Sequence, residues 1–382
     1  MCDTTVGEQF NAVDVTAVVR HQLMNYITYN HEYPKKLKTA FIGCGGHAQR
    51  NIYPAFQYAP IDLVAVCDLD ISRAEACARQ FGAPRAYHDY HEMLQKEQPE
   101  VVFIVTNYDK DFRPRYPELT IDCLNAGAHT WIEKPPAASS EEIREMIKVS
   151  AQTGKHVGVG FKKMFVPANQ KARGIIQSPE FGSITSIAAR YPQALPPLEE
   201  RSSARKMQSF LDHIVHPHSV LKYLAGELES IFVRRNQTIS SGIVSLRFKS
   251  GTIGVLHLSQ GQSARSYLER TEVIGEGANL IIENNIRLTY FRRGRPSGDY
   301  GRAVSYFDED ADSAPLVWEP EFSLGQLYNK GIFLLGYAGE VTYFTSRLLE
   351  GEGPETGTLD DALELLKVYE AYRKSDEEVV VV

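Results

Sequence analysis

The sequence predicts an α/β chain with two domains: a parallel sheet covered by helices, then an α+β domain with a large, mainly antiparallel sheet open on one face. Between residues 37 and 160, short apolar segments alternate with helical patterns, which is typical of a parallel sheet buried on both faces. After about residue 161, longer segments alternate between apolar and polar residues, which indicates half-buried antiparallel strands. The 382 residues are enough for two such domains.

The composition is that of a globular chain with no signature of a polyanionic partner. Hydrophobic residues make up 43% and charged residues 23%, which is ordinary for a folded protein. The net charge of −7 argues against nucleic acid or an anionic membrane as the main partner. No apolar run reaches the length of about 18 residues that spans a bilayer, and the N-terminal segment lacks the features of a secretory signal. We therefore expect a cytoplasmic protein.

The elements of the first domain, residues 37–160, follow one another in regular alternation. Its strands are expected at residues 39–42, 61–70, 101–106, 129–137 (with the loop that follows) and 156–161. Its helices are expected at residues 47–58, 72–82, 91–97, 117–127 and 140–154. Gly82 and Gly127 end two of these helices, as glycine commonly does.

The second domain is expected over residues 161–350. Its strands are expected within residues 183–191, 230–236, 242–260 and 270–293, with a hairpin turn at 249–251 and a long helix at 209–226. A C-terminal segment, residues 351–382, carries an amphipathic helix that we expect to pack back on the first domain, followed by a frayed tail. Residues 1–36 show helical spacing and are expected to form an extension that lies either on a neighbouring subunit or on its own domain.

The most informative local motif lies between the first strand and the first helix and reads Gly43-x-Gly45-x-x-Ala48. One glycine permits a tight turn, the next lets the backbone approach a pyrophosphate, and the helix N-terminus favours negative charge. The second strand ends near Asp68, whose carboxylate can accept hydrogen bonds from an adenosine ribose. The pattern predicts a Rossmann dinucleotide site; the alternative is a tight turn followed by an aspartate that caps a helix. Asp68 would repel a 2′-phosphate, which favours NAD over NADP, although the nearby Arg73 softens that preference.

Several stretches, in order and spacing, resemble the Gfo/Idh/MocA family, named for glucose–fructose oxidoreductase, inositol 2-dehydrogenase and a rhizopine catabolism protein. They are AFIGCGGHA at 40–48, AVCDLD at 65–70, AGAHTWIEKPPA at 126–137, GVGFKKMF at 158–165 and the helix motif Asp212-x-x-x-His216. The resemblance spans about residues 37–372. The Glu133-Lys134-Pro135 motif is its most specific element.

The resemblance implies a nicotinamide-dependent oxidoreductase in which Lys134 lies beside the nicotinamide and the substrate hydroxyl. It also implies a cis peptide bond before Pro135. Together with the glycine motif, it gives the expected cofactor-binding residues: Gly43, Gly45, Gly46, His47, Ala48, Asp68, Arg73, Thr106, Asn107, Glu133 and Lys134. The chain departs from the family's pattern at Asn107, Tyr116, Met164, Ile214 and Ser219, and in a charged insertion at 108–115. The departures at Asn107, 108–115, Tyr116 and Met164 are expected around the cofactor and substrate mouth, so the substrate cannot be inferred from that of any one family member.

Oxidation of a secondary alcohol needs a base for the hydroxyl proton beside the hydride acceptor, and three residues are expected to supply the chemistry. Asp212 and His216 are four residues apart and share one helix face, so the carboxylate is expected to orient the imidazole and raise its basicity. Lys134 is expected to stabilise a developing alkoxide. The alternative for Asp212 and His216 is a solvated surface pair. We expect no metal, because His213 and His218 point to other faces of the helix, and the five cysteines have no metal-ligand spacing.

Basic and aromatic side chains of the second domain are expected to contact a polar substrate. The expected substrate-binding residues are Lys134, Lys163, Tyr191, Asp212, His213 and His216, with Arg201 and Arg205 as further candidates in loops above the sheet. Aromatic rings stack on sugar rings while polar groups bind their hydroxyls.

These expectations combine into an NAD-dependent dehydrogenase that interconverts a ring hydroxyl and a ketone on a sugar, a glycoside (with C3 preferred) or a cyclitol. A non-catalytic dinucleotide-binding regulator and a reductase of a non-sugar substrate remain alternatives. The open face of the second sheet would expose apolar area, so a homo-oligomer (a dimer, a tetramer or a higher assembly) is expected.

Overall fold

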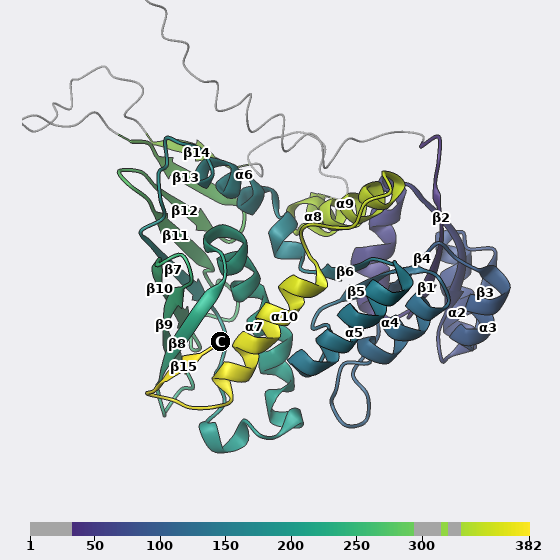
Figure 1. The fold of residues 1–382 in the computed structure, drawn as a ribbon, viewed down its shortest axis with the longest axis horizontal. Coiled ribbons are helices and arrows are strands. Elements are labelled where there is room, and N and C mark those ends of the chain that lie inside the picture. The colour runs from purple at the N-terminus through teal and green to yellow at the C-terminus, as the bar shows by residue number, and fades with distance from the viewer. Residues whose placement is uncertain (1–32, 294–314, 320–329) are drawn as a thin grey trace, which may run out of the picture.

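The computed structural model describes residues 33–293, 315–319 and 330–382. Within them the chain forms two sheets, and helices α7 (Ala204–Ala225) and α10 (Leu359–Tyr372) lie between these sheets (Figure 1). No helix of the described residues is long and apolar enough to cross a membrane. Most of the N-terminal extension expected at residues 1–36 lies outside the described residues.

The first domain is a doubly wound parallel sheet, as the sequence predicts. Its strands are β1 (Leu37–Ile42), β2 (Ile61–Cys67), β3 (Arg85–Tyr87), β4 (Val101–Ile104), β5 (His129–Glu133) and β6 (Val157–Gly160), in the order β3-β2-β1-β4-β5-β6. Its helices are α2 (Ile71–Phe81), α3 (Tyr90–Glu97), α4 (Tyr116–Asn125) and α5 (Ser140–Thr153). The strand order reverses at β1, and in such sheets ligands bind outside the carboxyl ends of the strands at this point.

Alternate residues of β1 bury into two different cores, one on each face of the sheet. Ala40 and Ile42 belong to the core shared with α3, α4 and α5, whereas Phe41 belongs to the core shared with α2 and α9 (Tyr337–Leu349). The helix expected at 47–58 instead forms a π turn, η1 (Ala48–Ile52), and a 3₁₀ turn, η2 (Tyr53–Tyr58). Pro54 lacks the amide hydrogen that a continuous α-helix would need there.

The second domain is built on one mixed sheet. Its strands are β7 (Ser186–Tyr191), β8 (Leu228–Arg235), β9 (Gly242–Phe248), β10 (Ile253–Leu258), β11 (Arg270–Ile274), β12 (Asn279–Glu283), β13 (Arg287–Phe291), β14 (Leu316–Trp318) and β15 (Val379–Val381), in the order β14-β13-β12-β11-β7-β10-β9-β8-β15. All neighbours are antiparallel except β7 and β10. The expected turn at 249–251 joins β9 to β10. The expectation of a frayed tail is wrong, because β15 pairs with β8 at the edge of the sheet.

Among the described elements, helices cover one face of this sheet and none packs on the other. The remaining elements are η3 (Lys162–Phe165), α6 (Pro167–Ile176), η4 (Leu198–Glu200), α7 (Ala204–Ala225), α8 (Lys330–Leu334), α9 (Tyr337–Leu349) and α10 (Leu359–Tyr372). The strand register aligns Ile253, Ile274 and Phe291 in one row across the open face, and all three side chains are exposed. The closed face packs against α6 and α7.

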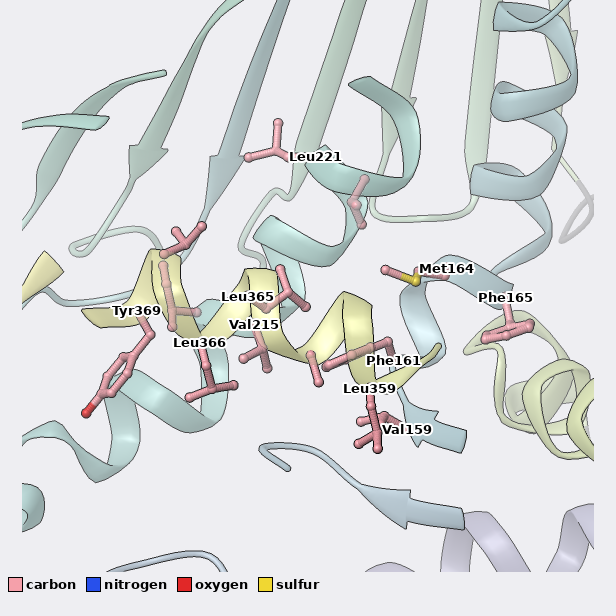
Figure 2. Packing of buried hydrophobic residues seen from close by; sticks show 14 of the residues in the cluster. Val159, Phe161, Met164, Phe165, Val215, Leu221, Leu359, Leu365, Leu366 and Tyr369 are labelled. Atoms are coloured by element: carbon pink, nitrogen blue, oxygen red, sulfur yellow. The ribbon is translucent and has the colours of Figure 1, made fainter. Parts of the chain in front are cut away.

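The C-terminal helix α10 joins the two domains. It begins with a capping box in which the side chains of Thr358 and Asp361 each accept a backbone amide of the other. Leu365, Leu366 and Tyr369 are buried among residues of α7, β6 and η3 (Figure 2). The helix contacts α5 of the first domain as well as α7 of the second. These contacts fix the position of α7, which carries Asp212, against the first domain.

Candidate functional site

The glycine loop after β1 has the geometry of a phosphate cradle. Gly43 has a φ of +105°, and a Cβ at this position would lie 1.9 Å from the carbonyl oxygen of Val105, so only glycine fits. A Cβ on Gly45 or Gly46 would meet no atom within 4 Å, so this backbone faces open space. The loop therefore leaves room for a pyrophosphate to approach its backbone.

Asp68 lies at the end of β2 and holds the glycine loop in place. Its Oδ2 accepts a hydrogen bond from the amide of Cys44 at 2.8 Å, and its Oδ1 accepts one from the amide of Asp70 at 3.0 Å. The guanidinium of Arg73 lies 3.6 Å from Oδ1. A carboxylate and a guanidinium thus meet where the adenosine ribose of a Rossmann ligand is expected.

Two cavities follow the carboxyl ends of the parallel strands and share part of their walls. The first, about 350 Å³, is lined by Ile42, Gly43, Gly45, Cys67, Asp68, Leu69, Asp70, Arg73, His88, Tyr90, Val105, Thr106, Asn107, Arg115 and Leu119. The second, about 540 Å³, is lined by Cys44, Gly45, Gly46, His47, Ala48, Gln49, Arg73, Val105, Thr106, Asn107, Tyr108, Pro114, Tyr116, Glu133, Lys134, Pro135 and Asp212. Every cofactor residue expected from the sequence lines at least one of them.

Lys134 and Asp212 meet across the domain boundary in the wall of the larger cavity. The Lys134 Nζ donates hydrogen bonds to Asp212 Oδ1 at 3.0 Å and to the Asp212 carbonyl oxygen at 3.3 Å. The two side chains are 14% and 32% exposed, so the pair is shielded but reachable. The peptide bond between Lys134 and Pro135 is cis, as expected. A loop after β5 and helix α7 thus supply one ion pair.

Glu133 lies behind this pair and is almost fully buried. His47 Nε2 lies 2.9 Å from Glu133 Oε1 and can donate to it, and the amide of Lys134 donates to Oε2 at 2.9 Å. Burial alone would raise the pKa of Glu133, but the hydrogen bond and charge of His47, with the charges of Lys134 and Lys162, lower it below its ordinary value. Glu133 is therefore an anion that fixes His47 and the backbone of Lys134.

The expected pairing of Asp212 with His216 is wrong. The Asp212 carboxylate contacts Lys134 and lies 3.8 Å from His213, whereas the buried ring of His216 has no hydrogen-bond partner among the described residues. Burial and then the charges of Lys134, Lys163 and Lys162 lower the pKa of His216 well below its ordinary value, where we expected a rise. The spacing places both residues on one helix face, but the ammonium arriving from the other domain is the partner that the carboxylate reaches.

The other expected substrate residues lie away from the larger cavity. The buried ammonium of Lys163 binds Glu269 and lies 4.8 Å from the centre of the Tyr191 ring, and these three residues line a separate, much smaller cavity against the sheet. His213 is half-exposed and its Nδ1 contacts the Ser209 carbonyl oxygen at 2.8 Å. Of the expected substrate-binding set, Lys134 and Asp212 line the larger cavity.

The two arginines proposed as further contacts have other partners. Arg201 is fully buried and donates to both carboxylate oxygens of Asp376 at 2.6 and 2.9 Å, so it ties the C-terminal segment to the loop before α7. The guanidinium of Arg205 lies 5.6 Å from the centre of the Phe112 ring, in the 108–115 insertion. Arg201 is therefore structural.

Several residues at or behind the site were not among the expected site residues, although Tyr116 and the 108–115 insertion were expected near its mouth. Tyr108 and Tyr116 line the larger cavity, and the Tyr116 hydroxyl donates to the Thr106 carbonyl oxygen at 3.1 Å. On α9, Tyr337 accepts a hydrogen bond from Lys162 at 2.8 Å, and both carboxylate oxygens of the buried Glu340 lack a partner among the described residues. Burial raises the pKa of Glu340 well above its ordinary value. The insertion was the one signal for Tyr108; no local pattern marked α9. Among the residues that the structure describes, no cluster of metal-ligating side chains occurs.

Comparisons with known proteins place this geometry in a family. Residues 37–161 match the model described as "Oxidoreductase family, NAD-binding Rossmann fold", and residues 169–281 match the "GFO/IDH/MocA C-terminal domain". The chain is 24% identical over 330 residues to myo-inositol 2-dehydrogenase of Thermotoga maritima, covering 82% of this chain and 89% of that protein. It is 32% identical over 156 residues to D-glucoside 3-dehydrogenase of Escherichia coli, covering 40% of this chain and 43% of that protein.

A solved structure supports the fold over nearly the whole chain. It is a levoglucosan dehydrogenase in complex with NADH and levoglucosan, with a TM-score of 0.72 and 19% identity, covering 91% of this chain and 99% of that one. The two family matches, the strand order and the glycine loop agree with one another. The chain belongs to the Gfo/Idh/MocA family of NAD-binding oxidoreductases.

Proposed function

We propose that the protein is an NAD-dependent dehydrogenase that interconverts a secondary ring hydroxyl and a ketone on a sugar, a glycoside or a cyclitol, with C3 of a glycoside as the favoured position. The Lys134–Asp212 ion pair carries the proposal, because it lies in the wall of a cavity that continues into the glycine loop. A protein that only binds a dinucleotide does not need a charged pair in the wall of this cavity. The relatives named for inositol and glucoside oxidation support the substrate class.

The residues present fit a bound dinucleotide. The loop at Gly43–Gly46 would hold the pyrophosphate, and Asp68 would accept hydrogen bonds from the adenosine ribose. We propose NAD rather than NADP, because the carboxylate of Asp68 would repel a 2′-phosphate, although Arg73 at 3.6 Å offsets part of that repulsion. When bound, the nicotinamide supplies the hydride acceptor.

The chain's own residues divide the remaining chemistry. The Lys134 ammonium, held by Asp212, stabilises negative charge that develops on the substrate oxygen. His216 is neutral at neutral pH because its pKa is lowered, and its buried ring, which does not line the larger cavity, would accept the hydroxyl proton through a water molecule. Glu133 fixes the backbone of Lys134 through its amide.

A non-catalytic regulator and a reductase of a non-sugar substrate are the competing functions. A panel of glycosides, free sugars and inositols with NAD or NADP, followed by NADH absorbance and product NMR, separates them from the proposed one. We expect NAD reduction with at least one ring polyol and a ketone as its product. Tight NAD binding without turnover of any panel member, in either direction, would favour the regulator.

We further propose that the protein acts in the cytoplasm as a homo-oligomer. The open face of the second sheet exposes Ile253 (62%), Ile274 (42%) and Val317 (61%), and a second copy would cover them. Light scattering on a sizing column gives the mass. Ile253→Lys should lower the assembly state, and a monomeric wild type would contradict the proposal.

A further inference from the structure

The 108–115 insertion forms a small hairpin that holds its own shape. Tyr108 and Pro114 pair as an isolated β-bridge at its base. The Asp109 carboxylate accepts hydrogen bonds from the amides of Asp111 and Arg113, each at 2.8 Å, and the amide of Asp109 donates to the Arg113 carbonyl oxygen at 2.8 Å. Such side-chain-to-backbone bonds fix a loop without help from the rest of the fold. The base residue Tyr108 is therefore held in position.

The hairpin also bridges the two domains at the mouth of the larger cavity. Arg113 pairs with Glu142 of α5 in the first domain. The ring of Phe112 lies under the guanidinium of Arg205, near the start of α7 in the second domain. Helix α7 carries Asp212, so the hairpin links Tyr108 to the helix that supplies the cavity's carboxylate.

Tyr108 is a buried phenol whose hydroxyl lies near the Asp212 carboxylate but makes no hydrogen bond of ordinary geometry among the described residues. Its side chain lines the larger cavity with Lys134 and Asp212, and its hydroxyl oxygen is buried without a hydrogen bond among the described residues. The neighbouring Tyr116 differs, because its hydroxyl already donates to the Thr106 carbonyl oxygen. Buried polar groups normally have partners, so the Tyr108 hydroxyl is suited to one that arrives with a ligand.

The chemistry of Tyr108 and Asp212 is complementary to one sugar hydroxyl. Burial and the Asp212 carboxylate raise the pKa of the Tyr108 phenol, so the phenol stays a donor at all physiological pH values. The carboxylate is a pure acceptor. A hydroxyl that accepts from the phenol and donates to the carboxylate satisfies both groups at once.

We propose that Tyr108 and Asp212 together bind a substrate hydroxyl on the ring carbon next to the one that is oxidised, so that the site selects vicinal diols. The bound hydroxyl is assigned to a neighbouring carbon because the Lys134 ammonium binds the reacting oxygen, and this ammonium lies 3.0 Å from Asp212 Oδ1. Adjacent ring hydroxyls are separated by about one hydrogen-bond length, which matches this spacing. The inference rests on the proposed function and adds to it a required feature of the substrate.

The test uses the best substrate of the panel and its two monodeoxy analogues, which lack the hydroxyl on one or the other side of the oxidised carbon. Tyr108→Phe should raise KM for the parent about tenfold and keep kcat within about threefold, since one hydrogen bond to a bound hydroxyl is lost. With one deoxy analogue, wild type and Tyr108→Phe should show the same KM, because that contact is already absent. Tyr290→Phe, a buried phenol of the second domain remote from the cavity, is the matched control.

The outcomes separate this inference from the proposed function. An active wild type with unchanged KM in Tyr108→Phe overturns the inference alone. A KM penalty of equal size on the parent and on both analogues also overturns it, because Tyr108 would then act only on Asp212 within the protein. A wild type inert towards every ring polyol overturns the proposed function, and this inference with it.

Discussion

Asp212 should be coupled energetically to Lys134 and not to His216, and a set of Asp212→Asn variants tests this. The Lys134–Asp212 pair is 3.0 Å long, with side chains 14% and 32% exposed. Fully exposed pairs contribute about 0.2–1 kcal/mol, and breaking a fully buried pair costs about 3–5 kcal/mol. This half-shielded pair falls between them, at about 1–2 kcal/mol, so Asp212→Asn should lower kcat/KM for the parent substrate by about 5–30-fold.

The assay is kcat/KM for the wild type, Asp212→Asn, Lys134→Ala, His216→Ala and the two double variants that contain Asp212→Asn. Lys134→Ala alone should cost about 10² or more in kcat while NADH binding, followed by fluorescence, stays nearly intact. The Asp212→Asn effect should shrink in the Lys134→Ala background, where only the contact of Asp212 with the substrate hydroxyl is left to lose, and it should persist in full in the His216→Ala background.

The reverse pattern would refute the reasoning. If the Asp212→Asn effect vanished with His216→Ala and persisted with Lys134→Ala, the carboxylate would act through the imidazole. Asp62→Asn controls for the loss of one negative charge. Asp62 is exposed near the start of β2, at the amino-terminal ends of the parallel strands, whereas the cavities lie at the carboxyl ends. It should leave kcat/KM unchanged.

Three further predictions follow from single side chains. Because the pKa of His216 is lowered, the imidazole is protonated only in acid, so kcat/KM for oxidation should stay level from neutral pH to below pH 6.5 and then fall. His216→Ala should remove this acidic fall in kcat/KM. A fall centred above pH 6.5 in the wild type would contradict the lowered pKa. Asp68→Arg should raise the NADP/NAD ratio of kcat/KM by about 10–100-fold, because two charged hydrogen bonds to the ribose are lost; a wild type that already prefers NADP would refute the ribose assignment. Arg201→Ala should lower the free energy of unfolding in urea by about 3–5 kcal/mol, because it leaves the Tyr372 carbonyl oxygen and the Asp376 carboxylate without their partner. As a control, Lys96→Ala breaks an exposed ion pair with Glu92 and should change the free energy of unfolding by less than about 1 kcal/mol.

The fold was predictable because its signals are local. The glycine loop, the alternating apolar segments and the terminal glycines of helices each depend on a few neighbouring residues. The strand β15 was missed for the opposite reason. Val379–Val381 is a short apolar run with no alternation of its own, and it becomes a strand only through pairing with β8, nearly 150 residues earlier in the chain. Edge pairing of this kind leaves no periodic trace in the sequence.

The cofactor half of the site was more predictable than the substrate half. Gly43 and Asp68 act through backbone geometry and strand-end position, which the motif specifies. Lys163 and Arg201 were expected near a substrate because they are cationic, yet Glu269 and Asp376 bind them. Whether a cation faces a cavity or a carboxylate depends on segments that are distant in the chain, and composition does not report that.

The pairing of Asp212 shows that helical spacing predicts which side chains share a helix face but not which partner each one contacts. An i, i+4 relation establishes that two side chains share a face, but each side chain on that face still has a choice of partners. Here the facing loop after β5 supplies an ammonium at 3.0 Å, and a full charge competes better for a carboxylate than a buried neutral imidazole does. Burial first, and then the charges of the same ammonium, Lys163 and Lys162, lower the pKa of His216. Burial together with these charges therefore reverses the direction of a pKa that was argued from the helix alone, and the interdomain contact pairs the Asp212 carboxylate with Lys134 instead of His216.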